Sequence, residues 1–518
     1  MEPERSNTPA DAADKTGPAP GAGSALVLLL AINLFNYIDR QVLSAVIPKL
    51  KLDGTLFDAA NDPWLQTKLG MLATAFMVSY MILSPAFAWA GDFVRRWWVV
   101  GVGVVLWSVA SGSSGLAHTF ALLLLTRAFV GIGEAAYGPI APAMISDLFP
   151  VRERGRVMAL FYAAIPVGSA LGFVIGGQLA QHFGWRHAFW VTYIGLIPGL
   201  LCFFMREPPR GRTATTAGTG HTHQSYWAVL GELKGIRSFV LCCAGMTATT
   251  FVLGGVAVWV PDYMFQRQAQ FVVTPQTLEK LGSDPKFLTL PQADGTPGSR
   301  VVPVEVAEKL RPAADGQELS YDGFKKVLAD RLTRDEARQY GEMLFDAATA
   351  PDSVTTGSVG LMFGVITVVS GLIATVVGGW LGDKLRNRGV RGAYFHAAGW
   401  STLVSWPFFV AMLFIPFPWA WVVLAVAIFG LFFNTGPANT ILANVSRSPI
   451  RATAFAINIL VIHALGDAIS PPVLGFIADL TDLHTAFLAV SVLILVGGGL
   501  WVAGARYLDE DTKRASEG

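Results

Sequence analysis

The sequence predicts an all-α polytopic membrane protein with twelve transmembrane helices, arranged as two six-helix bundles with pseudo-two-fold symmetry. Of its 518 residues, 53% are hydrophobic and only 14% are charged, whereas about 25% of the residues of a soluble domain are charged. The hydrophobic residues form long segments, and crossing the hydrocarbon core takes about 20 helical residues. The two halves of the chain also repeat the same loop motifs. These three observations support the fold class.

The first hydrophobic segment runs from Ser24 to Pro48, and eleven further segments follow it. We expect these helices at residues 66–90, 97–116, 119–145, 155–180, 187–205, 237–265, 357–382, 392–414, 418–445, 452–479 and 484–505. A transmembrane barrel would instead show alternating segments of about 10 residues, which the sequence lacks.

Polar stretches divide the helices into two groups of six. Residues 1–23 are rich in Pro, Ala, Gly and acidic residues, and we expect them to form a disordered cytoplasmic tail. They lack a basic region followed by a cleavage site, so the first helix is expected to remain as a transmembrane span. The other predicted parts are an N-terminal bundle (24–205), a linker (206–236), a C-terminal bundle (237–265 and 357–505), an insertion (266–356) and a C-terminal tail (506–518).

Basic residues in the loops predict the orientation in the membrane. Loops after the even-numbered helices hold most of them, including Arg152 and Arg447, whereas the opposite loops hold few. By the positive-inside rule both termini are cytoplasmic, and we expect a bacterial inner membrane. The insertion 266–356 then lies on the periplasmic side. The helical spacing of its second part favours a small helical cap or a poorly ordered loop over a binding module.

Two matching loops mark the repeat. Residues 88–96 read Ala-Trp-Ala-Gly-Asp-Phe-Val-Arg-Arg, and residues 379–388 read Gly-Trp-Leu-Gly-Asp-Lys-Leu-Arg-Asn-Arg. An aspartate at the end of a helix can cap a facing helix N-terminus and pair with arginines of neighbouring loops. We therefore expect a cytoplasmic gate that latches and unlatches as two bundles rock against each other. The predicted gate residues are Asp92, Arg95, Arg96, Asp383, Lys384 and Arg386.

Ionisable residues within the first and fourth helices are the main functional signal. An ionised side chain at the bilayer centre costs at least ~2.5–3.5 kcal/mol on insertion scales, so such residues pair with one another or line a wet path. On the first helix, Asn36, Tyr37 and Arg40 belong to one polar stripe, and Asp39 flanks it. The stripe predicts a substrate or proton path.

The fourth helix carries Arg127 and Glu134, which lie seven residues and roughly 10 Å apart along the axis. This distance is too long for a simple pair within one helix, so each needs a partner on another helix or a ligand. Further polar residues are Tyr162 on the fifth helix and Asn458, His463 and Asp467 on the eleventh. The predicted substrate-binding residues are Asn36, Tyr37, Arg40, Arg127, Glu134, Tyr162, His463 and Asp467.

Two interpretations of these buried charges remain open. In the first, they form satisfied pairs, such as Asp39 with Arg127, that fix the helix register. In the second, the carboxylates titrate. Desolvation raises the pKa of a carboxyl group and a nearby arginine lowers it, so making and breaking such a contact changes the affinity for protons. The proton-coupling residues would then be Asp39, Glu134 and Arg127.

The distribution of charge suggests the class of substrate. The seventh to tenth and the twelfth helices hold no ionisable residue near their midpoints, and several aromatic residues stand there instead. Examples are Trp259, Trp406, Phe432 and Phe433. A cavity with one charged end and one apolar end suits an amphipathic anion better than a sugar, although three Asn residues on the tenth helix leave a sugar open.

The sequence carries no phosphate-binding loop, nucleophile elbow or set of metal ligands. We therefore expect no enzyme activity, no cofactor, no metal and no nucleic-acid partner. The cysteines Cys202, Cys242 and Cys243 lie in apolar helices, where packing is the expected role.

Residues 36–40 (Asn-Tyr-Ile-Asp-Arg), 127–137 (Arg-Ala-Phe-Val-Gly-Ile-Gly-Glu-Ala-Ala-Tyr), 161–172 and 466–471 carry a resemblance to a known family. In these runs the chain resembles the spinster family of the major facilitator superfamily. The resemblance implies export of lysophospholipids and sphingosine phosphate, with a proton gradient implicated in several members. It gives functional weight to the residues that match Asp39, Arg127, Glu134 and His463. The insertion departs from the animal members, so no role is inherited for it.

The sequence thus predicts a proton-coupled secondary active transporter of a lysophospholipid-like or other amphipathic anion, working by alternating access. One alternative is a carrier for a small organic anion or drug, and another is a non-transporting membrane sensor. The paired gate loops disfavour a sensor, because latches are needed only for alternating access. The expected partners are the anionic substrate, protons and membrane lipids, and we expect a monomer.

Overall fold

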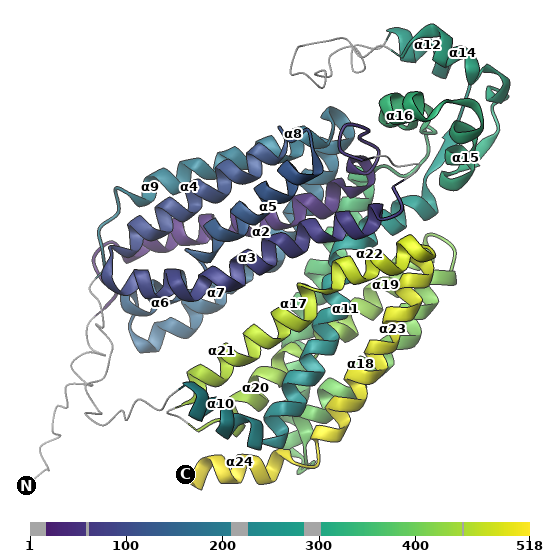
Figure 1. Cartoon of the computed structure of the whole chain (residues 1–518). Helices are drawn as coiled ribbons and strands as arrows, with labels where there is room; N and C mark the ends of the chain where they lie inside the picture. Colours follow the sequence, from purple (N-terminus) through teal and green to yellow (C-terminus); the bar gives the residue numbers. More distant parts are fainter. Residues whose placement is uncertain (1–16, 58–61, 209–225, 284–301, 448–449, 518) are drawn as a thin grey trace, which may run out of the picture.

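The computed structural model describes residues 17–57, 62–208, 226–283, 302–447 and 450–517. It confirms the predicted helical membrane fold, because the described residues contain eleven helical spans that are long and apolar enough to cross a membrane, several of them built from two successive helices. The helices form two bundles (Figure 1). Most of the predicted N-terminal tail, residues 1–16, lies outside the described residues, and the first helix begins at Ala22.

The N-terminal bundle contains α2 (Ala22–Leu50), α3 (Leu65–Phe93), α4 (Arg96–Ser114), α5 (Phe120–Ala135), α6 (Ile140–Leu148), α7 (Val151–Phe183), α8 (Trp185–Trp190) and α9 (Leu196–Cys202). Together α5 and α6 make the fourth span. The sixth predicted helix differs from expectation, because a 3-10 segment (Val191–Gly195) separates α8 from α9. Pro198 lacks the amide that would bond to the carbonyl of residue 194, which removes an α-helical hydrogen bond at this point.

The C-terminal bundle contains α11 (Arg237–Gln268), α17 (Thr356–Asn387), α18 (Ala393–Phe414), α19 (Trp419–Phe432), α20 (Thr435–Val445), α21 (Arg451–Ile462), α22 (Ser470–Leu480) and α23 (Leu483–Gly504). Between α21 and α22 lies a π-helical turn, His463–Asp467. The sequence predicted one uninterrupted helix here. Such π-turns inside α-helices occur often at functional sites.

The two bundles meet at the end that carries the insertion, called here the outer end, and diverge toward the end that carries the start of α2 and the helix Leu508–Glu517 (Figure 1). Glycines allow the close approach. A Cβ atom on Gly177 of α7 would lie 2.6 Å from the carbonyl oxygen of Thr356 of α17. A Cβ atom on Gly70 of α3 would lie 2.5 Å from the carbonyl oxygen of Pro471 of α22. Small residues therefore set the contact between the bundles.

A hydrogen-bonded cap also crosses this interface. The carboxylate of Asp479, on α22, accepts hydrogen bonds from the backbone amides of Gln66 and Thr67, each at 2.8 Å. The hydroxyl of Thr67 donates a third hydrogen bond at 2.6 Å. Amides in the first turn of a helix have no partner within the helix. Asp479 of the C-terminal bundle therefore accepts the hydrogen bonds that these first-turn amides of α3 cannot make within their own helix.

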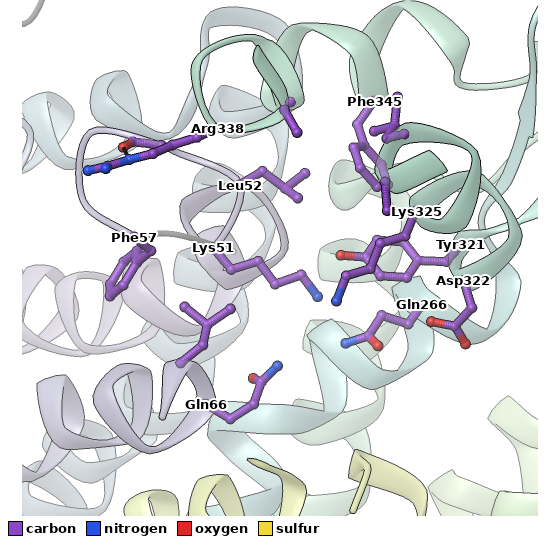
Figure 2. A pocket seen from close by; sticks show the side chains of 16 residues that line it. Lys51, Leu52, Phe57, Gln66, Gln266, Tyr321, Asp322, Lys325, Arg338 and Phe345 are labelled. Carbon is purple, nitrogen blue, oxygen red and sulfur yellow. Dashed lines mark hydrogen bonds between the residues drawn. The ribbon is translucent and has the colours of Figure 1, made fainter. Parts of the chain in front are cut away.

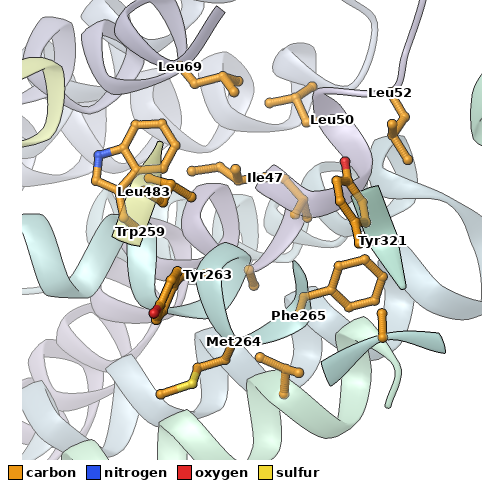
Figure 3. Close-up of a cluster of buried hydrophobic side chains, with 14 of the residues drawn as sticks. Ile47, Leu50, Leu52, Leu69, Trp259, Tyr263, Met264, Phe265, Tyr321 and Leu483 are labelled. Atoms are coloured by element: carbon orange, nitrogen blue, oxygen red, sulfur yellow. The ribbon is translucent and has the colours of Figure 1, made fainter. Parts of the chain in front are cut away.

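One apolar cluster fills the outer end (Figure 3). It joins Ile47 and Leu50 of α2 to Trp259 of α11 and Leu483 of α23, all of them buried. It also includes Tyr321 of the insertion. The two bundles and the insertion therefore share a single hydrophobic core at the outer end. This shared core keeps the outer ends of the bundles together.

The described part of the insertion is a folded cap. Its elements are β1 (Gln270–Val272), α12 (Pro275–Ser283), α14 (Val304–Lys309), β2 (Glu318–Ser320), α15 (Tyr321–Arg331) and α16 (Arg334–Ala348). The strands pair antiparallel, with Phe271 opposite Leu319. The ring of Phe271 lies 5.1 Å from that of Phe324 and 5.2 Å from that of Phe345. This aromatic core explains why the segment folds. Strands of three residues are too short to show an alternating pattern in the sequence.

Two further helices lie in the predicted linker and the predicted C-terminal tail. They are α10 (Tyr226–Gly235) and α24 (Leu508–Glu517). Asp511 of α24 accepts a hydrogen bond of 2.9 Å from the backbone amide of Ser238 and so caps α11. Glu232 of α10 accepts a hydrogen bond of 2.8 Å from Arg447. Both helices are therefore attached to the C-terminal bundle.

Candidate transport site

A buried ion pair joins the first and fourth spans. The guanidinium of Arg40 on α2 lies 2.7 Å from the carboxylate of Glu134 on α5. Glu134 is 1% exposed, and the second oxygen of its carboxylate, Oε1, has no hydrogen-bond partner among the described residues. Glu134 forms no ion pair with Arg127 of the same helix. The two residues lie seven positions apart along α5, whereas Arg40 reaches Glu134 from the neighbouring helix.

Aromatic rings surround the guanidinium of Arg40. Its carbon Cζ lies 4.9 Å from the ring centre of Tyr37, 5.0 Å from that of Phe76 and 5.3 Å from that of Tyr80. A cation over the face of an aromatic ring gains roughly 0.5–2 kcal/mol. The side chain of Arg40 still keeps 18% of its surface exposed. It is therefore held in place yet reachable from solvent.

Asp39 and Arg127 form a second buried charge site. Ser111 of α4 donates a hydrogen bond to Oδ1 of Asp39, whereas Oδ2 has no partner among the described residues. Arg127 is 1% exposed, and its Nε and Nη1 likewise have no hydrogen-bond acceptor in the described chain. The charges attract each other, but no ion pair within 4.0 Å forms between them. The predicted satisfied pair is therefore not present in this arrangement.

Hydrogen bonds between α2 and its neighbouring helices fix the position of the polar stripe. The side-chain amide of Asn33 donates to the carbonyl of Phe161 at 2.8 Å. The hydroxyl of Tyr137 donates to the carbonyl of Leu29 at 2.7 Å. Asn36 is buried and lies within electrostatic range of Glu134. Tyr162, in contrast, is 50% exposed. The structure thus brings Asn36 to the ion pair, whereas Tyr162 stays half exposed near Tyr37.

The polar residues of the C-terminal bundle sit in the π-turn. Nδ1 of His463 lies 2.9 Å from Oδ2 of Asp467. Both side chains are only partly buried, with 29% and 21% of their surfaces exposed. The hydroxyl of Thr74 on α3 donates to the carbonyl of Ala468 at 2.6 Å. The π-turn is therefore tied to the N-terminal bundle, and Asp467 holds His463 through the contact of its carboxylate with Nδ1.

The predicted gate residues interact within their own bundles. Arg96 lies 2.7 Å from Asp147 and 3.0 Å from Glu207, both in the N-terminal half. The carboxylate of Asp383 accepts a hydrogen bond of 2.7 Å from Tyr394, also on its own side. Since the bundles diverge at this end, a latch between them is not expected in this arrangement. The latch role of all six gate residues stays a prediction: Asp92, Arg95, Arg96, Asp383, Lys384 and Arg386.

The aromatic residues expected to line the C-terminal wall are largely packed. Trp259 is fully buried, and its ring nitrogen donates to the carbonyl of Pro471 at 2.9 Å. Phe433 is 6% exposed. Trp406 donates to Ser491 at 3.3 Å and is partly buried. Most of the expected apolar wall therefore belongs to the interior of the bundle in this arrangement.

Several residues that complete the site were not identified from the sequence. Ser111, Phe76 and Tyr80 contact the charged groups directly. A signal existed for Ser111, because Ser108, Ser111 and Ser114 recur at three-residue spacing on one helix. Tyr80 is a lone phenol in the middle of an apolar segment. Phe76 could not be distinguished from an ordinary packing residue.

Comparison with known proteins adds a second kind of observation. Residues 29–278 match the family model of the Major Facilitator Superfamily. The chain is 30% identical over 516 residues to protein spinster homolog 3 of Danio rerio, covering 95% of this chain and 86% of that protein. It is 29% identical to protein spinster homolog 1 of Homo sapiens, covering 96% of this chain and 84% of that protein.

Two solved structures share the fold. One is a bacterial homologue of the human lysosomal transporter Spinster in an inward-facing, unoccupied conformation, with a TM-score of 0.67, 17% identity, and coverage of 96% of this chain and 99% of that chain. The other is a D-xylose–proton symporter, with a TM-score of 0.59, 15% identity, and coverage of 92% and 96%. At these identities the likeness establishes the fold alone.

Proposed function

Because the chain belongs to the spinster family of the major facilitator superfamily, we propose that it couples protons to the transport of a lysophospholipid-like or other amphipathic anion. The chain is a multi-pass membrane transporter of this superfamily. Our proposal adds the class of substrate and the coupling ion. It also places the protein as a monomer in a bacterial inner membrane with cytoplasmic termini.

The observation that carries the proposal is the set of unsatisfied charged atoms in the N-terminal bundle. Asp39 and Glu134 each keep one carboxylate oxygen without a hydrogen bond, and Arg127 keeps two unpaired nitrogens, among the described residues. A buried unsatisfied group costs ~1–3 kcal/mol, and a charged one costs more. A purely structural network would satisfy these atoms. The lack of hydrogen-bond partners favours the interpretation that these side chains gain and lose protons or partners during a transport cycle.

The pair of Arg40 and Glu134 supplies a coupling mechanism. A substrate anion that binds Arg40 competes with the carboxylate of Glu134 for the same guanidinium. Once Glu134 loses this partner, its buried charge is destabilised and it takes up a proton. Anion binding and protonation therefore favour each other. This linkage corresponds to symport of the anion with a proton.

Arg40 is the better-placed group for the anionic head of the substrate. It is the partly exposed arginine of the site, whereas Arg127 is almost fully buried. A guanidinium can bind a phosphate through two parallel hydrogen bonds. Tyr37 stands beside it as a further donor, and Tyr162 lies within electrostatic range of Tyr37. Arg127 then acts on Asp39, whose charge it balances.

Binding to purified protein tests the substrate class. We expect a lysophosphatidate to raise the melting temperature of the wild-type protein more than a neutral monoacylglycerol with the same acyl chain. We also expect this difference to shrink in Arg40→Gln. Equal stabilisation by the charged and the neutral lipid would remove the amphipathic anion from the proposal.

A small organic anion is the second candidate. The specific observation in its favour is the packing of Trp259 and Phe433, which leaves less apolar wall for an acyl chain. A short dicarboxylate that stabilises the protein as strongly as a lysophosphatidate would support this candidate. The charged residues would keep the roles described above.

A further inference from the structure

A cavity lies beneath the cap, at the junction of the cap with both bundles (Figure 2). Its volume is ≈ 190 Å³. The walls come from the end of α2, the start of α3, the end of α11 and the cap helices α15 and α16. It is separate from the charged residues of the transport site, none of which lines it.

Cations dominate the polar lining of this cavity. They are Lys51, which directly follows α2, Lys325 of α15 and Arg338 of α16, and Asp322 is the acid that lines it with them. Figure 2 shows the ammonium groups of Lys51 and Lys325 turned toward the same space. Apolar side chains such as Phe57 complete the wall. The site thus combines positive charge with a partly apolar lining.

One of the two lysines has its charge balanced and the other does not. The ammonium of Lys51 lies 2.6 Å from the carboxylate of Asp262 and 4.7 Å from the ring centre of Tyr321. The second oxygen of Asp262 accepts a hydrogen bond of 2.8 Å from Gln266, so both oxygens are engaged. Within the part of the chain that the structure describes, Lys325 forms no ion pair within 4.0 Å. Lys325 therefore brings a positive charge without an ion pair to a cavity in which Lys51 is already paired with Asp262.

The environment of Lys325 favours an anion. Lys325 is an exposed residue, but partial desolvation of its ammonium and repulsion from Lys51 lower its pKa, and the attraction of Asp322 only partly offsets them. An anion placed between the two ammonium groups would relieve that repulsion. Nearby, Gln66 has a buried side-chain oxygen with no hydrogen-bond partner among the described residues. This acceptor suits a hydroxyl or a protonated oxygen of a ligand.

The size of the cavity limits what can enter. A cavity of 150 Å³ in another protein holds one benzene molecule, so a space of ≈ 190 Å³ admits an anionic group with a short apolar extension. A whole lipid does not fit. We infer that the cap and the two bundles together form a binding site for a phosphate group, held between Lys51 and Lys325. The phosphate is either free in solution or the head of a short alkyl ester.

The site exists only while its walls are together. Lys51 and Gln66 belong to the N-terminal bundle, Gln266 belongs to the C-terminal bundle, and Lys325 belongs to the cap. Separation of the outer ends would dismantle the cavity. A bound phosphate group would therefore favour the arrangement in which the outer end is closed.

Calorimetry on the purified full-length protein at constant ionic strength tests this inference. The probes are inorganic phosphate and hexyl phosphate. We expect saturable binding to the wild type and at least ten-fold weaker binding to Lys325→Gln. The matched control is Lys326→Gln, which removes the neighbouring lysine of the same helix. Both lysines are exposed, but Lys326 does not line the cavity, so the affinity of this variant should stay within two-fold of the wild type.

The two probes distinguish the sources of the phosphate group. Tighter binding of hexyl phosphate, still dependent on Lys325, assigns the site to an alkyl ester, whereas equal affinities assign it to free phosphate. The absence of saturable binding, or equal affinities of the wild type and Lys325→Gln, overturns the inference. Because Lys325 lies outside the transport site, Lys325→Gln should keep its stabilisation by lysophosphatidate. Failure of one proposal therefore leaves the other standing.

Discussion

At the scale of single residues, the protein places two acids and two arginines where the membrane interior makes unpaired charge costly. Arg40 and Glu134 form a close pair, while Asp39 and Arg127 attract each other without making an ion pair within 4.0 Å. Sequence reasoning identified all four, because charge within a long apolar segment is conspicuous. It could not assign the pairs, since helix spacing shows which residues share a face but not which helix lies opposite. The partners Ser111 and Tyr80 were missed for the same reason.

Glu134 is the residue on which proton coupling depends. Glu134→Gln removes the group that exchanges Arg40 for a proton, and we expect lysophosphatidate affinity to lose its dependence on pH. The measurement is the affinity of purified protein for lysophosphatidate between pH 5 and 8. The phosphate of the ligand also titrates in this range, but it does so equally for all variants, so a difference between variants reports on the protein. Asp330→Asn is the control, because Asp330 is an exposed acid of the cap. A Glu134→Gln profile that matches the wild type would exclude Glu134 from coupling.

The two arginines should respond differently to the same conservative change. Lysine reproduces the charge of arginine but not its planar pair of donors. Arg40→Lys should therefore weaken lysophosphatidate by roughly ten-fold, or about 1.4 kcal/mol, and leave a neutral monoacylglycerol nearly unchanged. Arg127→Lys should weaken both lipids equally and lower the melting temperature, because Arg127 is 1% exposed. If Arg127→Lys instead discriminated between the lipids, Arg127 would be the residue that binds the head group.

At the scale of elements, most helices could be predicted and their interruptions could not. The helical segments lie where long apolar runs predicted them, yet the π-turn at His463–Asp467 and the 3-10 segment at Val191–Gly195 were not expected. Such local changes in pitch depend on packing against neighbouring helices, which a single sequence does not display. The paired strands of the cap were also missed. They are too short to show a period, and their partners lie far apart in sequence.

Asp479 provides a test of how the outer end stays closed. Asp479→Asn keeps the size of the side chain but removes the charge that accepts three hydrogen bonds from Gln66 and Thr67 of α3. Loss of a helix cap costs about 0.5–2 kcal/mol, so the outer-open population should rise several-fold. Spin-label distances between the outer ends of α3 and α22 measure this shift. Asp482→Asn is the matched control, because Asp482 caps α23 within its own bundle.

The gate loops make the opposite prediction at the other end. Asp383→Asn should weaken a latch that forms only when that end closes, so it should favour the present arrangement without loss of lysophosphatidate binding. The readout combines spin-label distances across the diverging ends with lipid affinity. Reduced affinity with unchanged distances would mean that Asp383 serves the binding site and not the gate.

At the scale of the whole molecule, the contacts between the bundles gather at the outer end. Gly70 and Gly177 permit close packing there, Asp479 crosses the interface, and the cap adds Tyr321 to the same apolar core. The opposite end has its charged loops turned to their own bundles. This asymmetry is what one state of an alternating-access cycle requires. The sequence predicted two bundles and a gate, but which end is closed follows only from the structure.

Flux through reconstituted protein tests the central claim that anion transport is coupled to protons. In proteoliposomes held at zero membrane potential, symport of one proton with each anion predicts about ten-fold accumulation of the transported ionic form of labelled lysophosphatidate per pH unit, equivalent to 1.36 kcal/mol. Glu134→Gln should lose this accumulation while it still exchanges substrate across the membrane. Equal uptake by the wild type with and without the pH gradient would contradict the account.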